Sequence, residues 1–451
     1  MPGLNSAAPG PQTAEAVPFT YEQEWYDANV RQTYVHRNVR LSYEILGPLD
    51  GALFEQAVHR FVARHDALRM EVLPLNERTP MAAQRVRPLG PDERVVHHQE
   101  VKAVSAEQFG VYAAAVLTRD FLEPWTTGHR PYTLRLLRYS SEHHAFLATF
   151  QNLVFDGRAH HLFAQEIWRD YEALRRRQEV PGTAPSFAAA ALRQRTAFGP
   201  RHLRRAQDSW YDRAGFAGLN PWHRPDHAAA SEDGAVPAEL SAAQVAALRQ
   251  ACEREHCTLL QWVVAAFARA IAQCTGRRRL SLWTSMDSRR AAERDVVGMF
   301  AGVAPLKVEH ATAPLPEVRA EVSGQILEAL RYQQLSGRQL RTMLRELAPD
   351  EGWLGRDIHI NLRRFEGDHQ QTRHDGDLRV TADAYPLRRV TFANASALQL
   401  RCDEYRDRLF INLLFDGHRV GRQLAQAILG CLTADLTVDC GTDVRTPRKS
   451  S

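Results

Sequence analysis

The chain has 451 residues, 44% of them apolar and 24% charged, which is the composition of a soluble globular protein. The formal charge of +4 is small and the basic residues are spread along the chain, which argues against nucleic acid as the main partner. No run of about 18 apolar residues offers a membrane span.

The length predicts two or three units of ordinary domain size. Residues 1–17 are rich in Pro, Gly and Ala and have no basic start or apolar stretch, so we expect a loose tail and no signal peptide. This predicts a cytoplasmic protein. The cysteines lack both the density of a disulfide scaffold and a CxxC pair, and we expect reduced, mainly buried thiols at positions 252, 257, 274, 402, 431 and 440.

The first half of the chain mixes strand-like and helix-like periods. We expect a strand at 39–46, a helix after the Asp50-Gly51 turn, short strands between 70 and 103, and a helix over 105–121. A strand pair at 132–139 and 144–152 leads into an amphipathic helix that begins near Ala159.

The second half repeats this mixture after a stretch at 178–236 that loses periodicity and reads as a linker with one or two helices. Ser241 is a plausible helix N-cap, and a helix over 258–275 ends at Gly276. A strand at 279–287, a mostly helical stretch at 315–348 and three further strands follow. The expected fold class is α+β.

An internal echo supports this doubling. "NLVFDGRAHHLFAQ" at 152–165 resembles "NLLFDGHRVGRQLAQ" at 412–426, and both predict a strand, an Asp-Gly turn and a helix. Chance explains so short a match equally well. If the echo is real, it predicts two lobes of one plan with ligand between them.

The stretch at 130–174, "RPYTLRLLRYSSEHHAFLATFQNLVFDGRAHHLFAQEIWRDYEAL", resembles the active-site region of condensation domains from nonribosomal peptide synthetases, which belong to the chloramphenicol acetyltransferase superfamily. The family signature HHxxxDG falls on Gln151, Asn152, Asp156 and Gly157. Segments 49–72 and 283–308 are similar to further family motifs, and the resemblance covers roughly residues 18–438 in the family's order.

The resemblance implies two acyltransferase-like lobes in a V shape, with a tunnel along their interface. We expect a tail at 1–17, an N-terminal lobe at 18–177, the linker at 178–236, a C-terminal lobe at 237–440 and a tail at 441–451. The implied partners are acidic carrier proteins bearing acyl thioesters and a small-molecule or carrier-bound acceptor. No cofactor is implied beyond the carrier's phosphopantetheine arm, and the family is usually monomeric.

Asn152 replaces the signature histidine that deprotonates or positions the acceptor in the family. A side-chain amide has no proton affinity near neutral pH. Three histidines are candidate replacements for the missing base. His160 and His161 lie in the first turn of the next helix, and His359 lies on a strand that in the family runs near the tunnel. The alternative for each is a role in packing or at the surface. The pairs His97-His98 and His143-His144 lack the downstream Asp-Gly, and no cluster has metal-ligand spacing.

Two other positions bear on the site. Asp156 pairs in the family with an arginine that matches Arg289, although a turn and helix cap is the simpler role for Asp156-Gly157. Gly302 stands where the family usually has an asparagine, and the missing side chain predicts added room at the lobe junction. An altered substrate is one explanation of this change, and decay after a loss of catalysis is another. Residues 153–155 are expected in the core.

Two main hypotheses follow. The chain is a free-standing condensation-type acyltransferase that acts in trans, since no adenylation, carrier or thioesterase segment accompanies it, and it joins a carrier-tethered acyl group to an amine or hydroxyl. Alternatively, it is a non-catalytic condensation-like protein that binds a carrier protein and recruits another enzyme. Use of soluble coenzyme A thioesters is a lesser variant of the first hypothesis.

Overall fold

The chain divides into two compact units, each built from separate stretches of sequence. Unit 1 comprises Met1–Thr20, Arg37–Ala197 and Ala292–Met299, and unit 2 comprises Tyr21–His36, Phe198–Ala291 and Phe300–Ser451. A computed structural model describes residues 16–30, 38–73, 83–123, 125, 129–215, 222, 234–347, 357–365, 372–387 and 396–437. The predicted tails, apart from Ala16 and Val17, lie outside the described residues.

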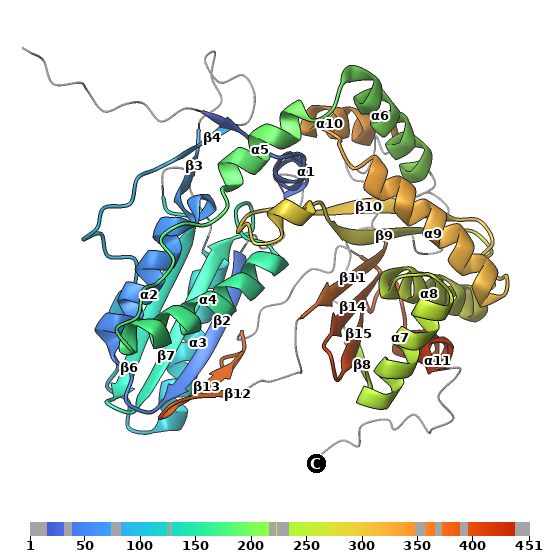
Figure 1. The fold of residues 1–451 in the computed structure, drawn as a ribbon. Coiled ribbons are helices and arrows are strands. Elements are labelled where there is room, and N and C mark those ends of the chain that lie inside the picture. The colour runs from blue at the N-terminus through green and yellow to red at the C-terminus, as the bar shows by residue number, and fades with distance from the viewer. Residues whose placement is uncertain are drawn as a thin grey trace, which may run out of the picture. The chain divides into compact units, whose positions relative to one another are not determined.

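Unit 1 combines strands with packed helices (Figure 1). Its strands are β1 (Val17–Pro18), β2 (Asn38–Leu46), β3 (Met70–Val72), β4 (Ala83–Val86), β5 (His97–Glu100), β6 (Tyr132–Ser140) and β7 (His143–Gln151). Its helices are α2 (Gly51–Arg64), α3 (Ala106–Leu122), α4 (Gly157–Arg175) and α5 (Phe187–Thr196), with a 3₁₀ turn at Asp66–Arg69. β7 lies between β2 and β6 and is antiparallel to both, which confirms the predicted strand pair.

The two faces of β7 meet different helices because successive side chains of a strand point to opposite sides. Phe146 packs edge-on against Phe54 of α2, with ring centroids 4.9 Å apart. Arg135 of β6, the cross-strand partner of Leu147, donates a hydrogen bond of 3.2 Å to Asp120 of α3. Helices α2 and α4 therefore cover one face of the sheet, and α3 covers the other.

A buried ion network joins α2 to α4. Arg64 contacts Glu166 and lies 2.5 Å from Asp170, and His65 lies 3.0 Å from the same Glu166 carboxylate. Burial alone raises the pKa of Glu166, but the hydrogen bonds and charges of His65 and Arg64 lower it below its ordinary value. Glu166 is therefore held as a carboxylate inside the unit.

Unit 2 contains the second sheet (Figure 1). Its helices are α1 (Tyr21–Val30), α6 (Pro200–Ala214), α7 (Ala242–Arg254), α8 (Leu259–Thr275), α9 (Leu315–Arg331), α10 (Gly337–Leu347) and α11 (Arg422–Thr437). Its strands are β8 (Gly234–Leu240), β9 (Leu280–Asp287), β10 (Ala301–Val308), β11 (Ile358–Arg364), β12 (Thr372–Asp375), β13 (Leu378–Ala382), β14 (Leu398–Glu404) and β15 (Leu409–Phe415). Six strands form a mixed sheet in the order β10-β9-β11-β14-β15-β8.

Local capping sets the helix ends of unit 2 as the sequence predicts. Ser241 caps α7 through a reciprocal capping box with Gln244. α8 ends at Gly276, whose φ of 71° is the left-handed conformation that glycine adopts without a Cβ clash. The stretch predicted as mostly helical at 315–348 is divided into α9 and α10.

The internal echo has the same element order but different turns. Asp156 immediately precedes α4, whereas α11 begins at Arg422, after a longer turn in which Asp416 contacts Arg419 at 2.7 Å. The predicted linker contains α5 and α6, and the predicted domain boundaries stay predictions.

The five described cysteines are free, but only Cys252 and Cys402 are buried, so the prediction of mainly buried thiols is wrong for the other three. Cys440 lies outside the described residues. Burial raises the pKa of the Cys252 thiol to about 12. No single helix of the described chain has the length and apolarity to cross a membrane; α7 and α8 reach that measure only as a pair bent by 100°.

We expect Arg64→Met to lower the free energy of unfolding by about 3 kcal/mol, because Glu166 and Asp170 lose the buried guanidinium between them and keep only His65 and the more exposed Arg169 as partners. Urea denaturation measures this loss. Arg176→Met is the matched control, since Arg176 is exposed and pairs with Glu172 at 2.7 Å on the same helix, and it should cost less than about 1 kcal/mol. Equal losses for the two variants would contradict the role given to the buried network.

Candidate functional site

The signature-like stretch forms a tight turn between β7 and α4. Leu153, Val154 and Phe155 are buried, as predicted, and Phe155 stacks on Phe150 with ring centroids 3.9 Å apart. Asp156 is 2% exposed, and its Oδ1 accepts a hydrogen bond of 2.9 Å from the Ala159 backbone N–H. Asp156 is thus the N-cap of α4, which is the structural role expected for it.

Gly157 is the first residue of α4 and is exposed. A Cβ atom built on Gly157 would meet nothing within 4 Å, and its φ lies outside the left-handed region. Space and backbone conformation therefore both tolerate a side chain at this position.

Gln151 and Asn152 differ in their surroundings. Gln151 is 3% exposed and lines a pocket of about 610 Å³ in unit 1. Its Oε1 is buried and has no hydrogen-bond partner. Asn152 is half-buried in the turn and is not among the residues that line this pocket. Of these two residues, Gln151 is therefore the one with a buried polar atom that lacks a hydrogen bond.

The pocket lies at the α3 face of the sheet because Thr149 and Gln151 alternate with the core residue Phe150. Asn38 closes one side, and its Nδ2 donates to the Phe121 and Glu123 carbonyls at 2.9 and 3.1 Å. These carbonyls end α3 without helical partners, so the asparagine stabilises the helix end. The described lining residues are Asn38, Arg94, Val95, His97, Asp120, Glu123, Trp125, His129, Arg130, Pro131, Tyr132, Thr133, Leu134, Thr149 and Gln151.

The pocket wall offers fixed polar groups. Burial raises the pKa of Tyr132 to about 12, so this phenol stays protonated at neutral pH. The Trp125 indole N–H is buried without a partner. Asp120 pairs with Arg135, and Arg130 pairs with Glu93. The pocket therefore suits a ligand with polar atoms, while its two imidazoles, His97 and His129, lie at exposed positions.

The other candidate histidines lie in separate places. His160 and His161 are half-buried in the first turn of α4, and the His161 Nε2 is shielded from solvent. His359 lies in unit 2 on β11. The histidine pairs without a downstream Asp-Gly have charged or buried surroundings: His98 contacts Glu55 at 2.9 Å, His143 contacts Glu44 at 3.1 Å, and burial lowers the pKa of His144 to about 4.

Asp156 belongs to unit 1 and Arg289 to unit 2. Within its own unit, Arg289 contacts Asp287 at 3.2 Å, and its guanidinium lies 4.4 Å from the centre of the Phe300 ring. The predicted pairing of Asp156 with Arg289 stays a prediction.

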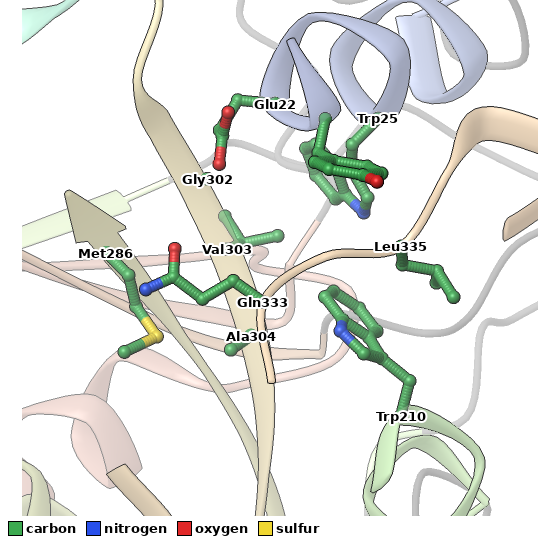
Figure 2. A pocket seen from close by; sticks show the side chains of 10 residues that line it. Glu22, Trp25, Trp210, Met286, Gly302, Val303, Ala304, Gln333 and Leu335 are labelled. Carbon is green, nitrogen blue, oxygen red and sulfur yellow. The ribbon is translucent and has the colours of Figure 1, made fainter. Parts of the chain in front are cut away.

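Gly302 lies on β10 opposite Met286 of β9. Figure 2 shows Glu22 of α1 reaching over this part of the strand. A Cβ atom on Gly302 would lie 3.5 Å from the Glu22 Cγ, and the adjoining pocket holds only about 20 Å³, room for about one water. Within unit 2, the room predicted beside Gly302 is therefore small.

The sequence reasoning missed most of the unit 1 pocket. Asn38 and Trp125 lie far from Gln151 along the chain, and only the strand pairing and the end of α3 bring them to one cavity. The one signal in the sequence for this pocket was Asn38, a polar residue at the start of a strand with apolar residues. Among the described residues, no group of three or more His, Cys, Asp or Glu side chains could hold a metal ion.

Comparison with protein families matches residues 13–380 to the condensation domain. The N-(5-amino-5-carboxypentanoyl)-L-cysteinyl-D-valine synthase of Penicillium rubens is 23% identical over 354 residues, covering 75% of this chain and 9% of that protein. The chain thus spans less than a tenth of this curated relative.

Solved structures match over nearly the whole chain. The first condensation domain of the CDA synthetase gives a TM-score of 0.67 at 18% identity, covering 96% of this chain and 98% of that one. The X-domain from teicoplanin biosynthesis, solved in complex with OxyB, gives 0.71 at 21% identity and covers 98% of each chain. These matches confirm the predicted α+β fold of two chloramphenicol-acetyltransferase-like lobes. The V shape and the tunnel stay predictions.

Asp156 gives a direct test of its two roles. Asparagine caps helices as well as aspartate does, so Asp156→Asn should leave the melting temperature nearly unchanged if capping is the whole role, and Asp156→Ala should cost about 1 kcal/mol. A buried pair with Arg289 would instead make Asp156→Asn and Arg289→Ala each cost about 3–5 kcal/mol. We expect Arg289→Ala to lower the melting temperature sharply, as measured by calorimetry. An unchanged melting temperature of Arg289→Ala would rule out the pairing of Asp156 with Arg289.

Proposed function

The chain belongs to the condensation-domain family, and we propose that it is an acyltransferase that acts on a carrier-protein-tethered thioester. It joins the acyl group to an amine or hydroxyl acceptor in nonribosomal peptide or related natural-product biosynthesis. The observation that carries this proposal is the unit 1 pocket of about 610 Å³, into which the signature stretch places Gln151. A pocket of this size accommodates a small organic acyl group.

The proposed reaction proceeds without a base at residue 152. The acceptor amine attacks the thioester carbonyl, a C–N bond forms, the C–S bond breaks, and the amine proton leaves to solvent or to the departing thiolate. Losing a general base typically costs about 10²- to 10⁴-fold, whereas holding two substrates together supplies effective molarities of about 10⁵ M or more. A neutral amine is a strong nucleophile, so positioning suffices for amide formation better than for ester formation.

The described groups support positioning. The Trp125 indole N–H is a hydrogen-bond donor in the pocket wall, and the Gln151 Oε1 is an acceptor. Asn152 can hydrogen-bond a substrate but cannot accept its proton. The Asp156 cap fixes the turn that carries both amides.

An intact-mass assay with acyl-loaded carrier protein and candidate acceptors tests this proposal. We expect product at a rate above the protein-free control, and a rise of about 10²-fold or more in Asn152→His, because a base is restored. Asn412→His is the matched control, since Asn412 stands at the corresponding place of the internal echo on β15. Absence of product from the wild type and from Asn152→His, with loaded carrier bound, would overturn acyl transfer.

A second candidate function is the recruitment of another enzyme to a carrier protein without catalysis. The specific observation in its favour is Asn152 in place of the signature histidine, together with the likeness to an X-domain that forms a complex with OxyB. Carrier binding without turnover in the same assay would favour this function.

Docking of the carrier protein should depend on salt. Only Lys102, Lys307 and Lys449 are lysines among 57 basic residues, so arginine supplies nearly all the positive charge, and guanidinium groups suit the carboxylates of an acidic carrier. We expect the Kd to rise with ionic strength in calorimetric titrations because salt screens surface charges. A Kd that does not change with salt concentration would exclude docking driven by arginines.

A further inference from the structure

Two cysteines of unit 2 lie side by side at the edge of its helical layer. The Cys274 Sγ of α8 lies 3.8 Å from the Cys431 Sγ of α11, although 157 positions separate the two residues in the sequence. Both cysteines are free and half-buried, and their chain neighbours Gln273 and Gly430 are exposed. The pair is therefore within reach of small solutes at the surface of the unit.

Packing within unit 2 fixes α8 and α11 against each other (Figure 1). Ile271 of α8 and Ile428 of α11, each about one turn before the cysteine of its helix, are fully buried in the hydrophobic core of the unit. Asp435, one turn after Cys431, accepts hydrogen bonds of 2.6 and 2.8 Å from Arg269 of α8. The closeness of the two sulfurs is thus a property of the packed helices.

The separation of 3.8 Å is a contact between two thiols and not a covalent bond. Rotation about the Cα–Cβ bond of a cysteine moves its sulfur by up to about 3 Å and leaves the backbone in place, so the two sulfurs can reach bonding distance. The folded unit therefore presents two thiols that a disulfide bond can join.

The two steps of disulfide formation proceed under different conditions at this pair. Burial, and then the hydrogen bond and charge of the neighbouring Cys431, raise the pKa of Cys274 to about 11. The thiolate is the nucleophile, so the first attack on an oxidant is slow near neutral pH. The second attack is intramolecular, because the partner thiol is already held beside the reacting sulfur at a high effective concentration. Once one sulfur has reacted, closure of the bond is therefore favoured over release.

We propose that Cys274 and Cys431 form a redox modification site, at which a low-molecular-weight disulfide oxidises the two thiols to an intramolecular disulfide that fastens α11 to α8. This inference goes beyond the proposed acyl transfer and does not depend on it.

The reaction is a pair of thiol–disulfide exchanges. One cysteine thiolate attacks a sulfur of the oxidant, a mixed disulfide forms, and one small thiolate leaves. The second cysteine thiolate attacks the protein sulfur of the mixed disulfide, the bond between Cys274 and Cys431 forms, and the second small thiolate leaves. The two cysteine sulfurs are oxidised, the two oxidant sulfurs are reduced, and the two thiol protons pass to the leaving thiolates.

The bond restrains the chain that builds the sheet of unit 2. Every strand of the six-stranded sheet except β8 lies between Cys274 and Cys431 in the sequence. A bridge across so long a segment removes conformational freedom from the unfolded chain and so stabilises the folded unit. Oxidation should therefore make unit 2 harder to unfold.

Mass spectrometry on the full chain tests the bond itself. The protein carries Cys440→Ser, which removes a cysteine outside the described residues, and is equilibrated with oxidised glutathione before the free thiols are trapped with N-ethylmaleimide. We expect a linked pair of peptides that contain Cys274 and Cys431, with neither glutathione nor N-ethylmaleimide on these two residues. Free thiols at both positions, a lasting glutathione adduct on either, or a bond from either to a different cysteine overturns the site.

Single substitutions in the same background separate this pair from the other thiols. Cys274→Ser and Cys431→Ser should each form no intramolecular disulfide, because no second thiol then lies beside the first. Cys257→Ser is the matched control, since Cys257 is also a half-buried free thiol of unit 2, and this variant should still join Cys274 to Cys431. Loss of the bond in Cys257→Ser, or an intramolecular disulfide in Cys274→Ser or Cys431→Ser, contradicts the assignment.

Calorimetry then measures whether the bond fastens the helices. The oxidised protein should melt about 5 °C or more above the reduced protein, because the bridge spans a long segment of the chain. Cys274→Ser, treated with oxidised glutathione in the same way, should show no such rise. An equal or lower melting temperature after complete oxidation overturns the fastening of α11 to α8, even where the bond has formed.

Discussion

The two-residue alternation of β7 is the constraint on which the unit 1 site depends. Phe146 and Phe150 are drawn into the aromatic core against α2 and α4, and each buries apolar area worth about 1.5–3 kcal/mol. Because a strand sends neighbouring side chains to opposite faces, Thr149 and Gln151 must then face α3. The pocket is thus placed by hydrophobic burial on the other side of the sheet.

The same burial fixes the turn after β7. Phe155 stacks on Phe150, and Asp156 caps α4 within the next residue, so little freedom remains between the strand and the helix. A turn held at both ends keeps its shape when a residue inside it changes. The turn can therefore keep its shape when Asn152, which lies inside it, is replaced, so the shape of the turn alone does not separate a catalyst from a recruiter.

Unit 2 applies the alternation differently. Its core strands carry Leu282, Ile360 and Leu400 toward the helices, and the opposite face carries polar groups that hydrogen-bond one another from β14 to β9. The Arg401 guanidinium can only donate, so it orients the Gln399 side-chain amide beside it. The orientation of these hydrogen bonds therefore cannot be deduced from any one of the residues alone.

The sequence by itself determined the elements, most helix caps and the family, because these depend on neighbours in the chain. Asp50, Ser241 and Gly276 act where local pattern predicts, and residues 153–155 are buried as expected. Only the tertiary structure decided that Gln151, and not Asn152, lines the unit 1 pocket, and that Asn38 and Trp125 join it. It also decided that Gln399 lies beside His359, since strand pairing brings β14 beside β11 from about 40 residues away. Contacts between residues distant in sequence carry no local signal, which is why the candidate site emerged only from the fold.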